Sequence, residues 1–116
     1  MKELHVIVFE QIGGTAAVST EDGKNLYQRI DAAFSNDIHV ILDFNNIDLI
    51  TSAFLNASIG RLYSKYDSPF IREHLKVTNM ARDDLALLKI VVDRAKEYFA
   101  RTDVIDNVIR DSLGDE

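Results

Sequence analysis

The amino-acid sequence predicts an α/β domain, with a small mixed sheet of three to four strands and about four helices packed against it. Short runs rich in β-branched residues alternate along the chain with longer segments whose apolar residues recur every three or four positions. The chain has 116 residues, is 47% hydrophobic and contains 1 Pro, which suits one core and is too short for two ordinary domains. Residues 1–116 are therefore expected to form a single domain.

Four runs have the composition of strands. Leu4–Phe9 places apolar and β-branched residues on both faces, which predicts a buried strand. After the turn residues Gly13 and Gly14, Thr15–Val18 fits either a short edge strand or a loop. Ile38–Phe44 is apolar at both parities and is interpreted as the central strand. Leu75–Thr78 alternates apolar with polar, as expected of a strand nearer the sheet edge.

The remaining segments have helical periodicity. Ser19 and Thr20 can cap a helix that ends at Ser35–Asp37, and Thr51 or Ser52 can cap a second helix that ends near Tyr66. The longest helix is predicted over about 81–101. A C-terminal amphipathic helix at about 103–113 needs a surface to cover, which its own domain, a symmetry mate or a partner could supply.

Composition and charge argue against several functional classes. A formal net charge of -6 disfavours binding to a phosphate backbone, so no nucleic-acid partner is expected. No apolar run is long enough for a membrane span and there are 0 Cys, which favours a cytoplasmic protein without thiol chemistry. His5, His39 and His74 lack metal-ligand spacing, and no nucleophile has an evident base. We expect no enzyme activity, no metal and no cofactor.

The centre of the chain resembles a known signature. Val40–Phe44, followed by Ile47 and then Ile50–Leu55, is similar to the strand, loop and helix start of STAS domains, the folds of bacterial anti-sigma factor antagonists and of the cytoplasmic part of sulfate transporters. The resemblance covers roughly residues 36–80 and implies a STAS-like sheet with helices packed against it.

The sequence also departs from that signature. Thr51 stands where the family has Asp, and Ala53 replaces the serine that is phosphorylated in the antagonists. Phe54 and Asn56 replace the two glycines, while Ser52 keeps the first serine. This pattern is closer to small, poorly characterised STAS-like bacterial proteins. The resemblance implies a regulatory role, with an ATPase of the histidine-kinase superfamily or an anti-sigma factor as partner.

The start of the second helix is the predicted functional site. Ser52 and Thr51 are the candidate phosphorylation sites, because a phosphate there would lie beside the positive end of the helix dipole; the alternative is that they only cap the helix. A small-molecule or nucleotide site at the same helix N-terminus is the alternative function. A protein partner is expected to contact seven residues: Asn45, Asn46, Asp48, Phe54, Asn56, Arg61 and Lys65.

Overall fold

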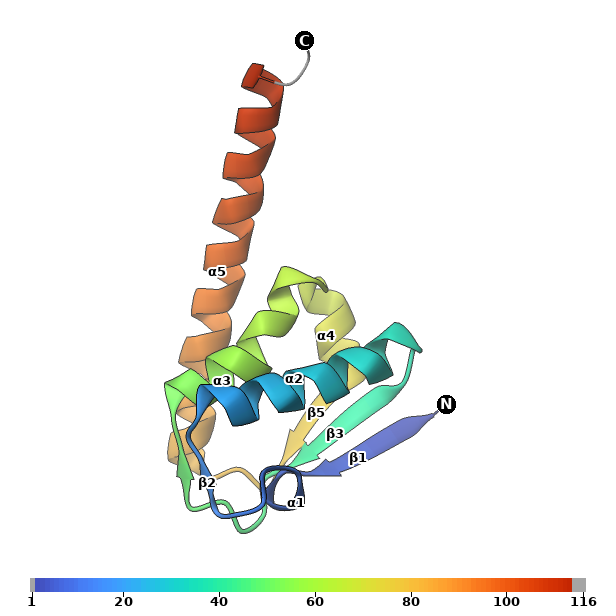
Figure 1. Ribbon diagram of the computed structural model, residues 1–116, viewed down its shortest axis with the longest axis vertical. Coiled ribbons are helices and arrows are strands. Elements are labelled where there is room, and N and C mark those ends of the chain that lie inside the picture. The colour runs from blue at the N-terminus through green and yellow to red at the C-terminus, as the bar shows by residue number, and fades with distance from the viewer. Residues whose placement is uncertain (1, 114–116) are drawn as a thin grey trace.

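A computed structural model describes the backbone of residues 2–113 and the side chains of residues 2–100. This part of the chain contains five strands, five α-helices and one 3-10 helix (Figure 1). In order they are β1 (Glu3–Ile7), α1 (Val8–Ile12), β2 (Ala16–Ala17), α2 (Thr20–Ser35), β3 (His39–Asp43), β4 (Leu49–Ile50), α3 (Ser52–Ser58), the 3-10 helix η1 (Gly60–Ser64), α4 (Ser68–His74), β5 (Leu75–Thr78) and α5 (Arg82–Leu113).

The strands form two small parallel sheets. The larger has the order β1-β3-β5, with β3 in the centre, and β2 pairs with β4 in the smaller one. The α/β fold class, the central strand and the edge strand at Leu75–Thr78 are thus confirmed. The expected mixed sheet is wrong, since every pairing among the described strands is parallel. The reason is that each strand of the larger sheet is joined to the next by a helical crossover, which returns the chain in the same direction.

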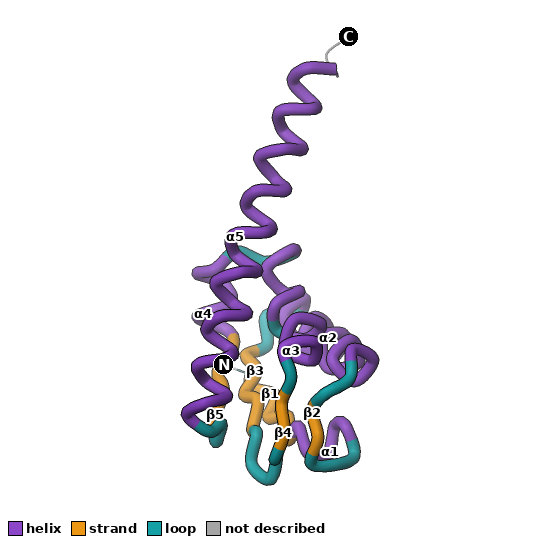
Figure 2. Tube along the Cα trace, turned by 90° about the vertical axis from the view of Figure 1, so that its left-hand side faces the viewer, coloured by secondary structure: helices purple, strands orange, loops and turns teal. Residues whose placement is uncertain are grey.

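One face of the larger sheet supports the core. Val6, Val40 and Leu42 point to this face and are buried against α2 and α3, which Figure 2 shows on the same side of the strands. The opposite face carries the exposed His5 and Ile7. On the central strand β3 the side chains of this face, His39, Ile41 and Asp43, are half-buried. The central strand is therefore buried fully on one side only, and the prediction of a strand with two buried faces is wrong.

A glycine sets the distance between α2 and α3. A Cβ atom added to Gly23 would lie 2.7 Å from the backbone carbonyl oxygen of Phe54 and 2.8 Å from the Cβ atom of Ala57. Neither separation is possible for real atoms. A glycine inside a helix ordinarily weakens it, but here Gly23 allows two helix backbones to approach closely.

Several helix boundaries differ from the sequence prediction. The predicted strand Leu4–Phe9 ends at Ile7, and Val8–Ile12 forms the short helix α1. The segment around Phe70, for which the sequence analysis predicts no helix, is the helix α4, which begins at Ser68, is capped by Asp67 and has Pro69 in its first turn. The predicted second helix divides after Ser58, where a tighter 3-10 turn begins at Gly60.

The C-terminal helix packs beside α3 and η1 rather than on the sheet. Its Val91 side chain lies against Gly60 of η1. The backbone is one continuous helix from Arg82 to Leu113, so the boundary expected near residue 102 is absent, and Figure 1 shows the end of α5 extending past the rest of the domain. Side chains of the predicted amphipathic helix at 103–113 lie outside the described ones, and their contacts stay a prediction. Within residues 2–113, no helix is both long and apolar enough to cross a membrane.

Candidate functional site

The start of α3 is fixed by Thr51. The Thr51 hydroxyl accepts a hydrogen bond from the Phe54 amide at 3.2 Å and donates one to the Val18 carbonyl at 2.8 Å. The first contact is a helix cap, and the second ties α3 to the segment after β2. Thr51 therefore has a structural role, and its hydroxyl proton is already used within the domain.

Ser52, the first residue of α3, does not cap the helix as Thr51 does. Its side chain is exposed, as are those of Ala53 and Asn56 on the same helix. Phe54, by contrast, is 0% exposed and belongs to the core, so the prediction that it contacts a partner is wrong. It is buried because α3 packs on two sides, against α2 and against α5. The surface that α3 offers consists of small and polar side chains with one free hydroxyl group.

The loop between β3 and β4 presents the three polar residues predicted from the sequence. Asn45, Asn46 and Asp48 are exposed, and Asn46 has a left-handed backbone with φ 68°. Asp43, at the end of β3, accepts hydrogen bonds from the Asn79 side chain and the Asn45 amide, both at 2.9 Å. These bonds, the Asn79 bond first, hold the pKa of Asp43 below its usual value. The loop is thus anchored by a carboxylate that is kept charged.

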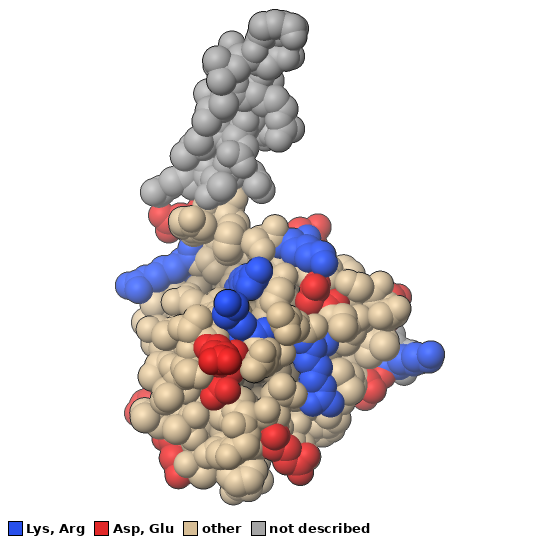
Figure 3. All heavy atoms as spheres, viewed as in Figure 1, with Lys and Arg blue, Asp and Glu red and all other residues tan. Residues whose placement is uncertain are grey.

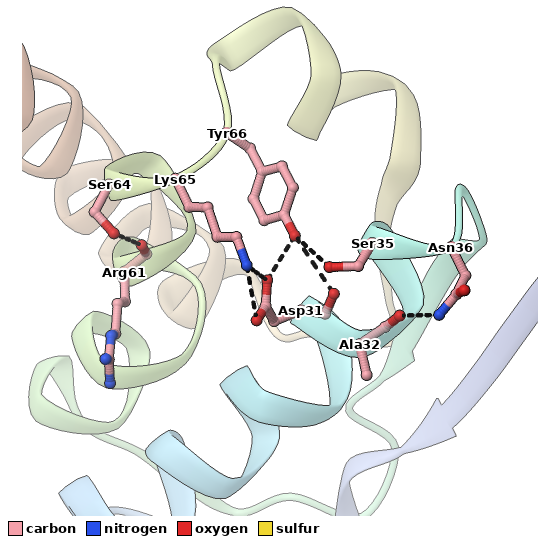
Figure 4. Close-up of polar contacts among 8 residues, drawn as sticks. All are labelled: Asp31, Ala32, Ser35, Asn36, Arg61, Ser64, Lys65 and Tyr66. Carbon is pink, nitrogen blue, oxygen red and sulfur yellow. Dashed lines mark hydrogen bonds and ion pairs between the residues drawn. The ribbon is translucent and has the colours of Figure 1, made fainter.

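A polar cluster joins α2 to the segment after η1 (Figure 4). The Tyr66 hydroxyl donates to Asp31 at 2.5 Å, and the Lys65 ammonium lies 3.0 Å from the same carboxylate. The bond from Tyr66, followed by those from Lys65, lowers the pKa of Asp31 despite its partial burial. Lys65 is therefore paired within the domain, which weakens the prediction that it orients an acidic partner.

Arg61 lines an open groove between α3 and α5. Its guanidinium carbon is 4.6 Å from the centre of the Tyr27 ring, and its side chain is exposed. The groove, called here the α3–α5 groove, has a volume of about 580 Å³. It is lined by Thr20, Ala53, Asn56, Ala57, Gly60, Arg61, Arg94, Ala95, Tyr98 and Phe99.

Charges of both signs are spread over the face that carries α2 and α3, with several Lys and Arg side chains near its middle (Figure 3). The formal net charge of -6 does not describe this face. The two arginines of the groove, Arg61 and Arg94, form no ion pair with any residue whose side chain the structure describes. The groove is thus mainly apolar with a basic rim.

Two histidines that seemed unrelated in the sequence meet in space. The centroids of the His39 and His74 rings are 4.4 Å apart. The His74 ring also stacks on that of Phe70, with 3.8 Å between the ring centroids. The buried His74 bonds to Asp37 through Nε2 at 2.7 Å and to the Phe70 carbonyl through Nδ1 at 2.9 Å, with Glu73 at 4.0 Å. Burial lowers the pKa of His74, but the bond to Asp37 and that to Phe70 outweigh it and raise the pKa overall.

The predicted site residues fall into two groups. Asn56 and Arg61 line the groove from α3 and η1, and Ser52 begins α3 next to the lining residue Ala53. Asn45, Asn46 and Asp48 lie in the loop between β3 and β4. The half of the groove that comes from α5 was missed. The signal available in the sequence was Tyr98, a large residue beside the predicted stripe of the longest helix.

A profile of the family described as a STAS-like domain of unknown function (DUF4325) matches residues 22–85, which is more than half of the chain. The chain belongs to this STAS-like family. The match runs from α2 into the start of α5 and includes the whole of α3, and it confirms the resemblance inferred from the central signature. No curated protein and no solved structure matches the chain.

Proposed function

We propose that this STAS-like domain is a non-enzymatic, cytoplasmic regulatory module that binds a partner protein through the start of α3 and the loop before it. The surface consists of the exposed residues Asn45, Asn46 and Asp48 of the loop and Ser52 and Asn56 of the helix. An ATPase of the histidine-kinase superfamily or an anti-sigma factor is the partner class that STAS membership suggests.

The observation that carries the proposal is that Thr51 has a structural role at the start of α3 and Ser52 does not. Thr51 caps the helix and bonds to Val18, so α3 keeps its position whatever happens to the next residue. Ser52 is exposed and is not needed for the cap. A change at Ser52 can therefore alter the surface without unfolding it.

Phosphorylation of Ser52 would be such a change. The Ser52 oxygen would attack the γ-phosphorus of ATP, lose its proton and form a phosphate ester, and ADP would leave. The added charge of about -2 would lie at the helix start, where the dipole favours an anion. The helix would remain folded, and the partner would meet an anion in place of a hydroxyl group.

Capture of partner proteins by the immobilised domain tests the proposal. The Ser52→Glu variant should lose at least one partner that the wild type binds, and Gln28→Glu, which adds the same charge on the exposed face of α2, should keep it. Capture of identical proteins by all three would contradict the proposal. Intact-mass analysis of the domain incubated with ATP and the captured partner then shows whether Ser52 gains a phosphate, with Ser52→Ala as the control.

Thermal-shift measurements with nucleotides and small anions address the alternative of a ligand-binding domain. One observation weakens that alternative, because the Phe54 amide at the helix start is already bonded to Thr51. A ligand present at a hundred times its dissociation constant would stabilise the domain by about 2.7 kcal/mol. Such a shift, abolished by Ser52→Glu, would favour the ligand site over the protein partner.

A further inference from the structure

We propose that the α3–α5 groove binds the C-terminal segment, residues 102–116, of a second copy of the chain, so that two copies exchange their ends. This inference goes beyond the proposed function, which concerns a different partner. It rests on three features: the chemistry of the groove, the composition of the segment and the direction of α5.

The groove combines an apolar floor with positive charge. Ala57, Gly60 and Ala95 leave room between the helices, and the Tyr98 and Phe99 rings line one side. Arg61 and Arg94 line the groove with exposed side chains, and neither forms an ion pair with a side chain that the structure describes, although Arg61 lies over the Tyr27 ring. An open groove of this kind suits an amphipathic helix that presents apolar residues to the floor and acidic residues to the rim.

The C-terminal segment has the matching composition. Residues 102–116 contain five acidic residues and one basic residue, Arg110. The acidic residues are Asp103, Asp106, Asp111, Asp115 and Glu116. Five apolar residues recur at helical spacing in the same segment: Val104, Ile105, Val108, Ile109 and Leu113. The segment is thus complementary to the groove in both charge and hydrophobicity.

The direction of α5 prevents a chain from filling its own groove. Arg94 to Phe99 form one wall of the groove, and the same helix continues without a break to Leu113. At a rise of 1.5 Å per residue, Leu113 lies about 20 Å farther along the axis than Phe99. The segment therefore cannot reach the groove of its own chain, whereas a second molecule can supply one. A second copy related by a two-fold axis covers both segments and fills both grooves at once.

This arrangement also has a consequence for the proposed partner. Asn56 lies in the groove and belongs to the partner surface as well. A copy docked in the groove would cover it, so self-association and partner binding would compete.

Sedimentation equilibrium of the full chain tests the exchange by charge reversal. The wild type should dimerise. The groove variant Arg61→Glu/Arg94→Glu and the segment variant Asp103→Lys/Asp106→Lys should each raise the dissociation constant of the dimer by about tenfold or more, because like charges would then face each other. Combining all four substitutions in one chain restores opposite charges and should restore the dimer. Arg72→Glu/Lys76→Glu, which reverses two exposed charges on α4 and β5, should dimerise like the wild type.

Three results would overturn the inference. The first is a wild type that stays monomeric at every concentration reached. The second is a dimer that the groove variant leaves unchanged, which would mean that the segments pair elsewhere. The third is a combined variant that fails to recover although circular dichroism shows it folded. None of these results depends on Ser52, so the proposed partner function would fail or stand separately.

Discussion

Replacing Gly23 by alanine tests the close crossing of α2 and α3. In an ordinary helix interior this change would stabilise by about 0.5–1 kcal/mol, because alanine has the higher helix propensity. Here the new methyl group would lie 2.7 Å from the Phe54 carbonyl oxygen and 2.8 Å from the Ala57 methyl group. A backbone carbonyl cannot rotate away, so the two helices must separate. Overpacking of this kind costs about 1–3 kcal/mol, which at the middle of both ranges exceeds the gain in helix propensity and leaves a net loss of about 1 kcal/mol.

The assay is urea unfolding followed by circular dichroism, at a fixed low protein concentration because self-association would add to the apparent stability. The midpoint should fall with an unchanged m-value, and the melting temperature should fall by about 5 °C for a domain of this size. Gly14→Ala is the matched control, since no atom lies within 4 Å of the added methyl group and its φ is not positive.

The result that refutes the reasoning is a Gly23→Ala variant as stable as the wild type or more stable. Helix propensity would then outweigh the contact, and the two helices would have to adjust at little cost. A large loss in the Gly14→Ala control would also contradict the reasoning, because it would show that any alanine in place of glycine is harmful in this chain.

Three other sites give predictions that the same unfolding assay checks. Thr51→Ala should lower the free energy of unfolding by about 1–2 kcal/mol because it removes the cap of α3. Ser52→Ala should change it by less than about 0.5 kcal/mol, and equal losses would contradict the assignment of a structural role to Thr51 alone. Tyr66→Phe keeps the ring and removes the hydroxyl group, which donates to the Asp31 carboxylate and makes longer contacts to the Asp31 carbonyl and the Ser35 hydroxyl. A loss of about 1 kcal/mol is expected, and no loss would mean that these bonds are not stabilising. The pKa of His74 is raised above its usual 6.5, so protonated His74 stabilises the folded state. This stabilisation is fully present below about pH 6.5 and is lost as pH rises through the raised pKa. Stability should therefore fall over that range in the wild type and less so in Asp37→Asn; an equal fall in both would exclude the ion pair as its cause.

Much of the fold could be predicted because the core strands and long helices have strong periodicity. The short elements were missed for local reasons. α1 begins with Val8 and Phe9, which have high strand propensity and continue the pattern of β1, and Gly13, which ends the helix with φ 78°, is the local signal for it. α4 has a recognisable signal in Asp67 and Pro69, the cap and first-turn residues of many helices, but a proline also marks the end of a helix, so this signal is ambiguous in the sequence.

The candidate site could be predicted only in part. The helix cap at Thr51 and the exposure of Ser52 follow from local rules of helix termini, and both residues were found. The burial of Phe54 and the second wall of the groove depend on α5, which follows α3 by more than twenty residues in the sequence. Contacts between elements so far apart leave no periodic trace in either segment.

The strand order β1-β3-β5 has a consequence for how the chain folds. Leu4 pairs with Val40, which is 36 positions later, and Val40 pairs with Leu75 after a further 35. The entropy of closing a loop depends on the logarithm of its length, so the two crossovers cost nearly the same and neither pairing is favoured by chain length. The order of synthesis favours the pairing of β1 with β3, because the first crossover is complete while the ribosome is still making the second. The central strand can thus acquire its first neighbour before β5 exists, and β5 then adds to an edge that is already formed.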